Sequence, residues 1–374
     1  MAGRNERVNE VARVFFRLGV VGFGGPAAHI AMMRDEVVRR RGWVSDAEFA
    51  DLVGATNLIP GPNSTELAIH LGSRRAGARG LLAAGVCFIG PAVAIVSVLA
   101  WLYRRYGTEP AAVDLRYGIL PVIVAIVAQA LVGLARTSLR HPVHVTVAVA
   151  SAVGFLVGVH ELLALVVGGA VVAVWRAGTY LRSNRLHAPV VVATVLGTVP
   201  RVTEWRLFLV FLEVGSVLYG SGYVLLAFLQ RRLVDGLGWI TTQQLLDAVA
   251  VGQITPGPVF TTATFIGWQI DGAVGAAVAT VGIFAPSFAL VALLGRLVPW
   301  MQRRPLAKAF LDGVTAASLG LMAGVLVDLA DTALNDVLTI TMAAIAAAIL
   351  VLSRVNSSWL VGAGALVGVI HAIV

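Results

Sequence analysis

Four ionisable side chains lie within long apolar stretches of this sequence: Arg17, His29, Glu66 and His70. Ionisable residues at membrane depth are costly to bury and usually line a substrate or proton pathway. Glu66 and His70 are four residues apart, which places both on one face of a helix. Together these side chains predict a polar cavity to which Arg17 brings positive charge, and in which His29 or Glu66 takes up and releases protons.

Two of these residues also have plainer explanations. Arg17 could instead extend its side chain to the membrane interface, or pair with an acid such as Glu66 or Glu213. His70 could likewise reach the interface. We therefore expect Arg17 at a substrate, and we take Glu66, His29 and Glu213 as candidates for coupling to a second ion.

Breaks in the backbone beside these side chains are the second chemical feature. Pro60-Gly61-Pro62 and Pro256-Gly257-Pro258 interrupt apolar segments, as do the glycine-rich stretches 22–26 and 219–223. A helix that starts at such a break presents unpaired N–H groups and the positive end of its dipole, which attract anions. Proline is tolerated there because its missing N–H would have no partner in the first turn. We interpret these prolines as structural helix breaks: Pro26, Pro60, Pro62, Pro256 and Pro258.

The substrate-binding residues that we expect are the basic, hydroxyl, amide and glycine positions at or near these breaks: Arg17, Gly24, Gly25, His29, Asn57, Gly61, Asn63, Ser64, Thr65, Gly220, Ser221, Gly257 and Thr261. Glycine at such a break allows the backbone to approach a ligand closely. The scattered glycine pairs Gly168-Gly169 and Gly362/Gly364 are expected instead at helix contacts, which small residues favour in membranes.

The composition predicts that membrane helices position these residues. The chain has 374 residues, of which 58% are hydrophobic and 13% charged, and its net charge is +8. Uncharged runs at 80–103, 117–135, 273–295 and 355–374 match the roughly 20 residues that a helix needs to cross a bilayer. Arginines gathered in short loops favour cytoplasmic loops over nucleic-acid binding. The single cysteine, Cys87, argues against a disulfide or a cysteine-based metal site.

A duplication is visible in the sequence. A shift of 196 residues superposes Gly19 on Gly215 and one PGP step on the other, and after a one-residue gap a shift of 195 pairs Pro91 with Pro286. We predict a first transmembrane repeat at 1–181, a linker at 182–205 and a second repeat at 206–374. The predicted fold is an all-α polytopic membrane protein, in which each half contains a PGP-broken helix or a re-entrant hairpin.

The loop charges predict that the two repeats face opposite sides of the membrane. Loop 73–79 carries three arginines, whereas its counterpart 268–272 carries only an aspartate. Loop 136–142 carries two arginines, whereas its counterpart 328–336 carries three aspartates and no base. Because basic loops stay on the cytoplasmic side, we predict an inverted repeat with an odd number of crossings per half, about ten in all. Inverted repeats with paired broken helices are typical of secondary transporters.

Three motifs of the first half carry a resemblance to a known family: Phe23-Gly24-Gly25-Pro26, Arg40-Arg41-Gly42-Trp43 and Pro60-Gly61-Pro62. With them the chain resembles the chromate ion transporter family of prokaryotes, in its long two-domain form. The resemblance implies export of chromate from the cytoplasm and chromate resistance, with sulfate as a competing anion. The second half departs from the pattern, since Gly220-Ser221-Gly222 replaces the glycine-glycine-proline and Glu213 replaces Arg17. We therefore expect the first half to contribute more to binding.

The function predicted is that of a secondary transporter, not an enzyme, which exports chromate across a prokaryotic inner membrane as a multi-pass protein. A transporter of sulfate or another anion is the alternative, and a membrane-embedded enzyme is disfavoured because no HExxH motif or nucleophile elbow occurs. The expected partners are chromate, the lipid bilayer and a second copy of the chain in a homodimer. No nucleic acid, cofactor or metal is expected.

Overall fold

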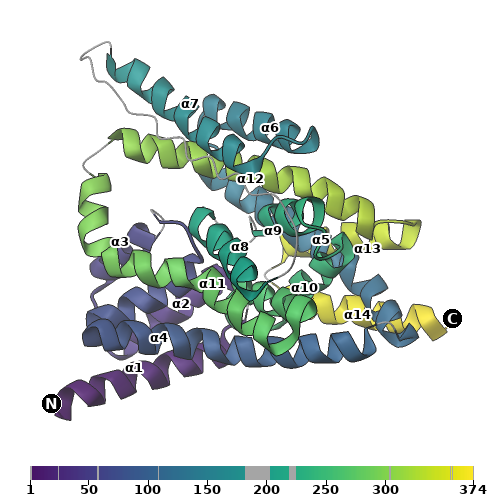
Figure 1. Ribbon diagram of the computed structural model, residues 1–374, viewed down its shortest axis with the longest axis horizontal. Coiled ribbons are helices and arrows are strands. Elements are labelled where there is room, and N and C mark those ends of the chain that lie inside the picture. Colours follow the sequence, from purple (N-terminus) through teal and green to yellow (C-terminus); the bar gives the residue numbers. More distant parts are fainter. Residues whose placement is uncertain are drawn as a thin grey trace.

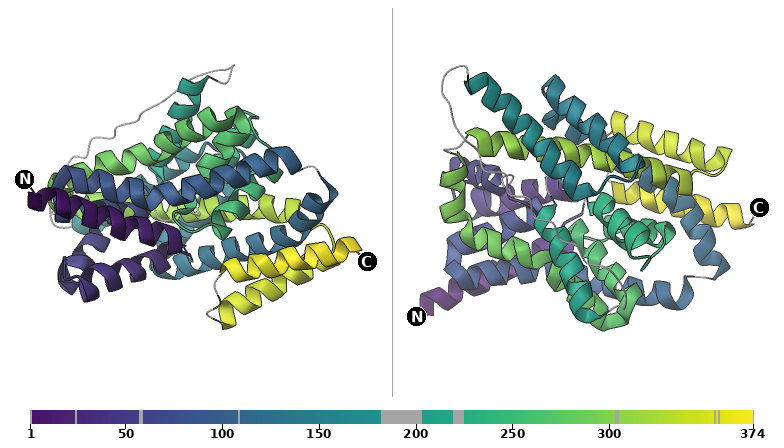
Figure 2. Two further views of the ribbon diagram at one scale, coloured as in Figure 1. Left: turned by 90° about the horizontal axis from the view of Figure 1, so that it is seen from below. Right: turned by 45° about the horizontal axis from the view of Figure 1, so that its top comes forward.

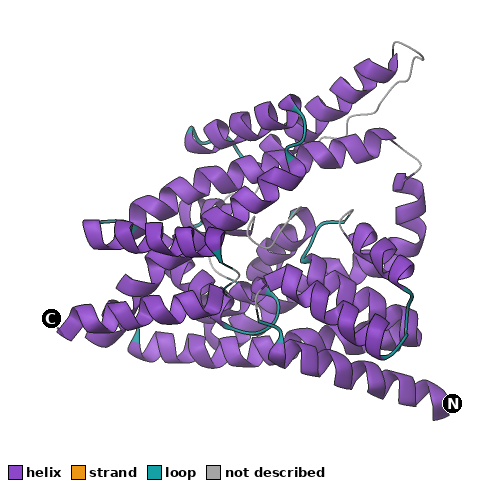
Figure 3. Ribbon diagram, turned by 180° about the vertical axis from the view of Figure 1, so that it is seen from behind, coloured by secondary structure: helices purple, strands orange, loops and turns teal. Residues whose placement is uncertain are grey.

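The structure of the chain is a computed structural model. It describes residues 2–23, 25–56, 59–107, 109–181, 203–218, 225–302, 305–353, 355 and 357–373, and within these ranges the regular structure is entirely helical (Figures 1 and 3). The first half contains α1 (Ala2–Val21), α2 (Gly25–Arg34), the π-helix η1 (Asp35–Arg40), α3 (Asp46–Thr56), α4 (Asn63–Tyr106), α5 (Pro110–Ser138), α6 (Pro142–Leu156) and α7 (Glu161–Leu181). The second half contains α8 (Glu204–Val217), α9 (Leu225–Leu229), the π-helix η2 (Gln230–Gly236), α10 (Thr242–Ile254), the short 3₁₀ helix η3 (Val259–Thr261), α11 (Thr262–Gln302), α12 (Pro305–Ala333), α13 (Val337–Leu352) and α14 (Ser357–Ile373).

Five helical segments of the described chain are long and apolar enough to cross a membrane. They are α4, residues 113–138 of α5, residues 161–178 of α7, residues 259–293 of η3 and α11, and α12. Helices α6, α13 and α14 are shorter apolar helices. The class of a helical, multi-pass membrane protein predicted from the composition is thus confirmed.

Each PGP step separates two helices. In the first half α3 ends at Thr56 and α4 begins at Asn63, and in the second half α10 ends at Ile254 and η3 begins at Val259. The central glycines, Gly61 and Gly257, have φ of 136° and 97°, in the region that favours glycine. The break therefore depends on both residue types, because proline cannot continue the hydrogen-bond ladder and glycine alone adopts this turn easily.

Helices α4 and α11 each fold back on themselves shortly after the PGP step. In α4 the chain reverses at Ala76 and Gly77, where Gly77 has φ of 64°, and in α11 it reverses at Asp271 and Gly272, where Gly272 has φ of 56°. Gly72 lies against Gly80 across this reversal, a contact that a straight helix would not allow. Each PGP step is thus followed by a short helical arm and then by a long one.

Helices of the two halves pack against each other in a reciprocal way. Within each half the first helix lies on the hairpin helix, α1 on α4 and α8 on α11, and α4 also packs on α11. The last two helices of each half pack on the other half: α6 and α7 lie along α12, while α13 and α14 lie along α5 (Figures 1 and 2). The halves are therefore interlocked rather than arranged side by side.

Glycines bring these exchanged helices together at equivalent places. Gly118 of α5 lies against Gly364 and Gly368 of α14, and Gly313 of α12 lies against Gly168 and Gly169 of α7. The helix-contact role predicted for Gly168-Gly169 and for Gly364 is confirmed. Gly362, in contrast, faces open space.

Replacing Gly364 by valine is expected to destabilise the fold by about 1–3 kcal/mol, because the new side chain would overlap the backbone of Gly118. Valine at Gly362, two residues earlier on the same helix, has room and is the matched control. Thermal unfolding of the purified variants in detergent measures the difference. Equal unfolding midpoints for the two variants would contradict the packing described.

Candidate functional site

The two PGP loops meet the opposite halves through a pair of crossed backbone hydrogen bonds. The N–H of Gly61 donates to the carbonyl oxygen of Leu218 at 2.8 Å, and the N–H of Gly257 donates to the carbonyl oxygen of Gly22 at 2.8 Å. Gly22 and Leu218 are equivalent under the 196-residue shift, as are the two glycine donors. Each PGP loop is therefore anchored to the end of the first helix of the other half.

A buried polar cluster lies beside the first PGP loop. Ser64, Thr65 and Glu66, in the first turn of α4, are 2%, 0% and 0% exposed, and His29 of α2 is 1% exposed. His29 Nε2 donates to the Gly22 carbonyl oxygen at 2.8 Å, and in the neutral ring Nδ1 accepts from the Ser64 hydroxyl at 3.3 Å. The same carbonyl thus receives the Gly257 amide and the His29 ring, which ties the cluster to both halves.

Glu66 is the acid of this cluster, and its side chain is fully buried. Its Oε1 accepts a hydrogen bond from the Ser287 hydroxyl of α11 at 3.4 Å. Its Oε2 and the Thr65 Oγ1 are buried and have no hydrogen-bond partner among the described residues. A β-carbon added to Gly61 would overlap the Glu66 carboxyl group and come within 2.7 Å of Ser287 Oγ. The φ of Gly61 therefore favours glycine, and a larger residue there would also displace the Glu66 carboxyl group.

The equivalent region of the second half is less polar. The hydroxyl of Thr261 donates to the carbonyl oxygen of Pro258 at 2.9 Å, and that of Thr262 donates to the carbonyl oxygen of Val259 at 2.7 Å. Both hydroxyls therefore donate to backbone atoms of the same helix start. Apolar or smaller residues stand at the positions equivalent to His29, Ser64, Glu66 and Ser287, namely Leu225, Phe260, Thr262 and Ala92. The buried polar cluster is thus a feature of the first PGP step.

Several predicted residues lie differently from the expectation. Arg17 is exposed on α1 and forms no ion pair with any described residue. Glu213 pairs with Arg232 at 2.9 Å, and neither acid proposed as a partner of Arg17 contacts it. The amides of Gly61 and Gly257, expected to face an anion, are instead used in the crossed bonds.

The other predicted site residues lie at the starts of α2 and α4 or in the PGP steps, where the structure describes them. Gly25 begins α2 with φ of 76°, and Pro26 lies in its first turn. Asn63 begins α4 and is half-buried. The prolines of both PGP steps are buried. Four candidates lie outside the described residues: Gly24, Asn57, Gly220 and Ser221.

Sequence reasoning missed Ser287. It is fully buried in α11 and supplies the hydroxyl that reaches Glu66 from the other half. A signal was present, because Ser287 follows Pro286, which aligns with Pro91 in the repeat. At this aligned position the second half has a serine where the first half has Ala92, and such a difference in polarity could have drawn attention to Ser287.

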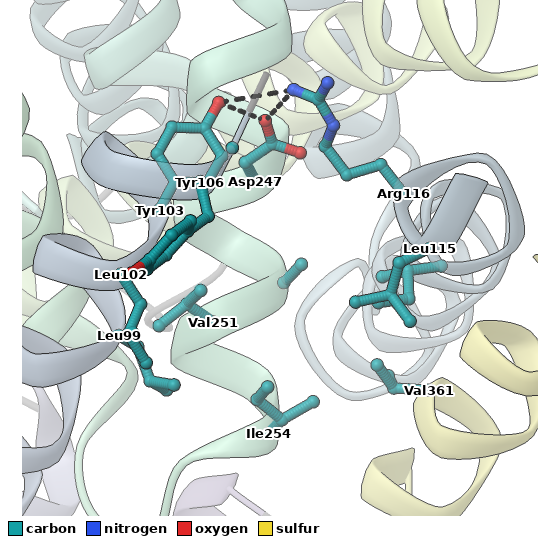
Figure 4. Close-up of a pocket in the computed structure, with 13 residues that line it drawn as sticks. Leu99, Leu102, Tyr103, Tyr106, Leu115, Arg116, Asp247, Val251, Ile254 and Val361 are labelled. Atoms are coloured by element: carbon teal, nitrogen blue, oxygen red, sulfur yellow. Dashed lines mark hydrogen bonds and ion pairs between the residues drawn. The ribbon is translucent and has the colours of Figure 1, made fainter. Parts of the chain in front are cut away.

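A separate cavity of about 280 Å³ lies between α4, α5, α10 and α14 (Figure 4). Its walls are mainly leucine, isoleucine and valine side chains, and Asp247, Tyr103 and Arg116 meet at one end. Asp247 Oδ2 accepts from the Tyr103 hydroxyl at 2.6 Å and from Arg116 at 3.2 Å. Because Asp247 already neutralises Arg116, this cavity provides no uncompensated positive charge among its described residues to bind an anion.

The Arg-Arg-x-Trp stretch has a structural role. Arg41 and Trp43 donate to Glu10 Oε1 at 3.0 and 3.3 Å, and Arg75 donates to its Oε2 at 2.8 Å. Partial burial raises the pKa of Glu10, but the hydrogen bonds from Arg75, Trp43 and Arg41 and the charge of Arg75 outweigh it and hold this pKa below its usual range. The cluster fastens the segment after η1 to α1 and to the turn of α4.

Comparisons with known proteins agree with this architecture. The family model described as "Chromate transporter" matches residues 9–174 and 205–369. The chromate transport protein of Cupriavidus metallidurans is 30% identical over 97% of this chain and 93% of its own length. The probable chromate transport protein of Synechococcus elongatus is 31% identical over 95% and 91%, and the chromate transport protein of Pseudomonas aeruginosa is 29% identical over 88% and 82%. No solved structure was found to match the chain. Since the family model covers both halves, this chain belongs to the chromate transporter family.

Proposed function

We propose that the chain is a secondary transporter that exports chromate from the cytoplasm across a prokaryotic inner membrane and thereby confers chromate resistance. One observation carries the proposal: two buried polar atoms, Thr65 Oγ1 and Glu66 Oε2, have no hydrogen-bond partner among the described residues and lie at the start of a broken helix. A polar ligand bound at this helix start would satisfy both atoms. Relatives named as chromate transport proteins support chromate as that ligand and favour a transporter over an enzyme.

The binding site proposed lies at the first PGP step. The hydroxyls of Ser64 and Thr65 and the polar side chains of Asn63 and His29 surround the helix start, where the helix dipole favours negative charge. A tetrahedral oxyanion accepts hydrogen bonds from such donors. Gly25, Gly61, Gly257 and Thr261 would shape the backbone around the site. Arg17 is exposed on α1 and would act at that surface.

We further propose that residues 1–181 and 206–374 form an inverted repeat joined by the linker 182–205, with about ten crossings in all. The reciprocal contacts support a two-fold relation, because α5 holds α14 as α12 holds α7, and the PGP loops exchange equivalent bonds. The opposite charges of equivalent loops favour an axis in the membrane plane. The substrate would then lie near the midplane, where the two breaks meet.

Export of an anion needs no nucleotide under this proposal. An inside-negative membrane potential favours outward movement of negative charge by about 2.3 kcal/mol per charge per 100 mV. Accumulation of labelled chromate in everted membrane vesicles tests the function, with vesicles that lack the protein as the control. We expect uptake by the wild type, driven by the potential, and weaker uptake when sulfate competes. No accumulation above the control would refute chromate export, and stronger uptake of sulfate than of chromate would favour the alternative anion.

A further inference from the structure

Glu66 differs from the buried acids Asp247 and Glu36 in having no cation beside it. Asp247 accepts from Arg116, and Glu36 accepts from Arg41 at 2.9 Å. Glu66 is 0% exposed, has only the distant Ser287 hydroxyl as a donor, and forms no ion pair with any described residue. An ionised carboxylate in such surroundings is very unfavourable, so the neutral acid is the form that this conformation accommodates.

Its position also separates Glu66 from the other two coupling candidates. Both ring nitrogens of His29 are engaged, one with the Gly22 carbonyl and one with the Ser64 hydroxyl. Glu213 is paired with Arg232 and partly exposed. Of these three candidates, Glu66 is the one whose carboxylate has an oxygen, Oε2, that is buried and has no hydrogen-bond partner among the described residues.

An oxyanion next to an ionised Glu66 would meet like charge in a site with little water. A protonated Glu66, in contrast, could donate a hydrogen bond from Oε2 to an anion oxygen, which would satisfy both groups. We propose that Glu66 is a proton-binding site linked to the oxyanion site, so that each oxyanion binds together with one proton on Glu66. The inference rests on the proposed function. The proton comes from water on the side where the anion enters and returns to water where it leaves, so a dianion crosses with one net negative charge.

Among the described residues, no other charged group near the short arm of α4 pairs with the Glu66 carboxylate in place of this proton. The described ionisable residues on the elements that pack against α4 are Glu6, Arg7, Glu10, Arg13 and Arg17 on α1, His29 and Arg34 on α2, Asp46, Glu48 and Asp51 on α3, Asp247 on α10 and Asp271 on α11. Those on α4 itself include His70, Arg74, Arg75 and Arg79. The structure shows no hydrogen bond or ion pair from any of these to Glu66.

The purified full-length chain in liposomes that contain a pH-sensitive dye provides the test, with chromate as the probe. We expect wild-type chromate entry to carry one proton per chromate into the lumen. Binding measured in detergent should weaken as pH rises, approaching about tenfold per pH unit above the titration of Glu66. Glu66→Gln, which mimics the neutral acid, should bind chromate with little dependence on pH and carry no proton. His70→Gln, one turn further along the helix, should keep the wild-type behaviour. Chromate itself takes up a proton in acid, so all variants are compared in the same buffers.

Each outcome decides between the two proposals. If the wild type neither binds nor moves chromate, the proposed function fails and this inference fails with it. If the wild type moves chromate but Glu66→Gln carries the same number of protons, or if His29→Gln alone abolishes proton movement, only this inference is overturned. A folded Glu66→Gln protein that binds no chromate also overturns it, because the neutral form should bind. Should Glu66→Gln not fold, Glu66→Thr, which copies the second-half residue, replaces it.

Discussion

Replacing Gly61 by alanine is expected to lower the initial rate of chromate transport by a factor of about 10 to 100. An alanine at φ of 136° costs about 1–3 kcal/mol in backbone strain, and each 1.4 kcal/mol or so corresponds to a factor of ten. The new methyl group would also overlap the Glu66 carboxyl group and crowd Ser287. Relief requires the Glu66 carboxyl group to move, or the loop to shift away from the Leu218 carbonyl that anchors it. Transport in everted vesicles, normalised to the amount of protein in the membrane, measures the loss.

Gly54 provides the matched control for this substitution. It lies in α3, a few residues before the same PGP step, and a β-carbon added there would meet nothing within 4 Å. Alanine is also a better helix former than glycine, so Gly54→Ala should transport at the wild-type rate. If Gly61→Ala transports as well as Gly54→Ala, the PGP loop does not need the geometry described here.

Local features of this fold were well predicted from the sequence. The duplication, the helix breaks at the PGP steps and the glycine contact at Gly364 all depend on residue type and spacing, which determine local backbone conformation. His29 and Glu66 were singled out because an ionisable residue in an apolar stretch is unusual, and both are buried. These predictions needed no knowledge of which helices are neighbours.

The exchange between the halves could not be predicted in that way. No local pattern indicates that the Gly61 amide would bond to Leu218, or that Ser287 would reach Glu66, because these partners are more than 150 residues apart. For that reason the amides of the two PGP glycines were wrongly expected to face an anion. Helix partners in a membrane are chosen by close packing of small residues, and many glycines here offer such contacts.

The position of Arg17 could have been predicted better. The buried residues of α1 include Val11, Val14, Phe15 and Leu18, which recur at helical spacing and define the face that packs on α4. Arg17 falls outside this face, and it is exposed. The type of the residue suggested a role in binding, but the periodicity of its neighbours placed it elsewhere.

The two halves differ in how firmly their equivalent helices are fastened. Asp247 of α10 is joined to Tyr103 and Arg116 (Figure 4), whereas Asp51, its equivalent on α3, is exposed. Leu311 stands at the position equivalent to Arg116, so the first-half aspartate has no such arginine. The Asp247 group therefore fastens α10 to α4 and α5 of the first half, and among the described residues Asp51 of α3 has no equivalent contact.

Replacing Asp247 by alanine is accordingly expected to destabilise the protein by about 2–4 kcal/mol. Removing one member of a buried ion pair leaves the other charge without compensation, which typically costs about 3–5 kcal/mol, and we lower the range because the Arg116 side chain is 24% exposed. The Tyr103 hydroxyl also loses its acceptor. Asp247→Asn should lose less, since the amide oxygen can still accept from Tyr103. Unfolding of the purified variants in detergent, followed by circular dichroism, measures the series.

Asp51→Ala is the matched control, and as a surface substitution it should change stability by no more than about 0.5 kcal/mol. Arg116→Leu, which copies Leu311 of the second half, should recover part of the stability when it is combined with Asp247→Ala, because no unpaired charge then remains beside the cavity. The double variant should thus unfold less readily than the sum of the single effects predicts. Equal stability of Asp247→Ala and Asp51→Ala would show that the Asp247 group does not fasten α10. Additive effects in the double variant would show that Asp247 and Arg116 are not coupled.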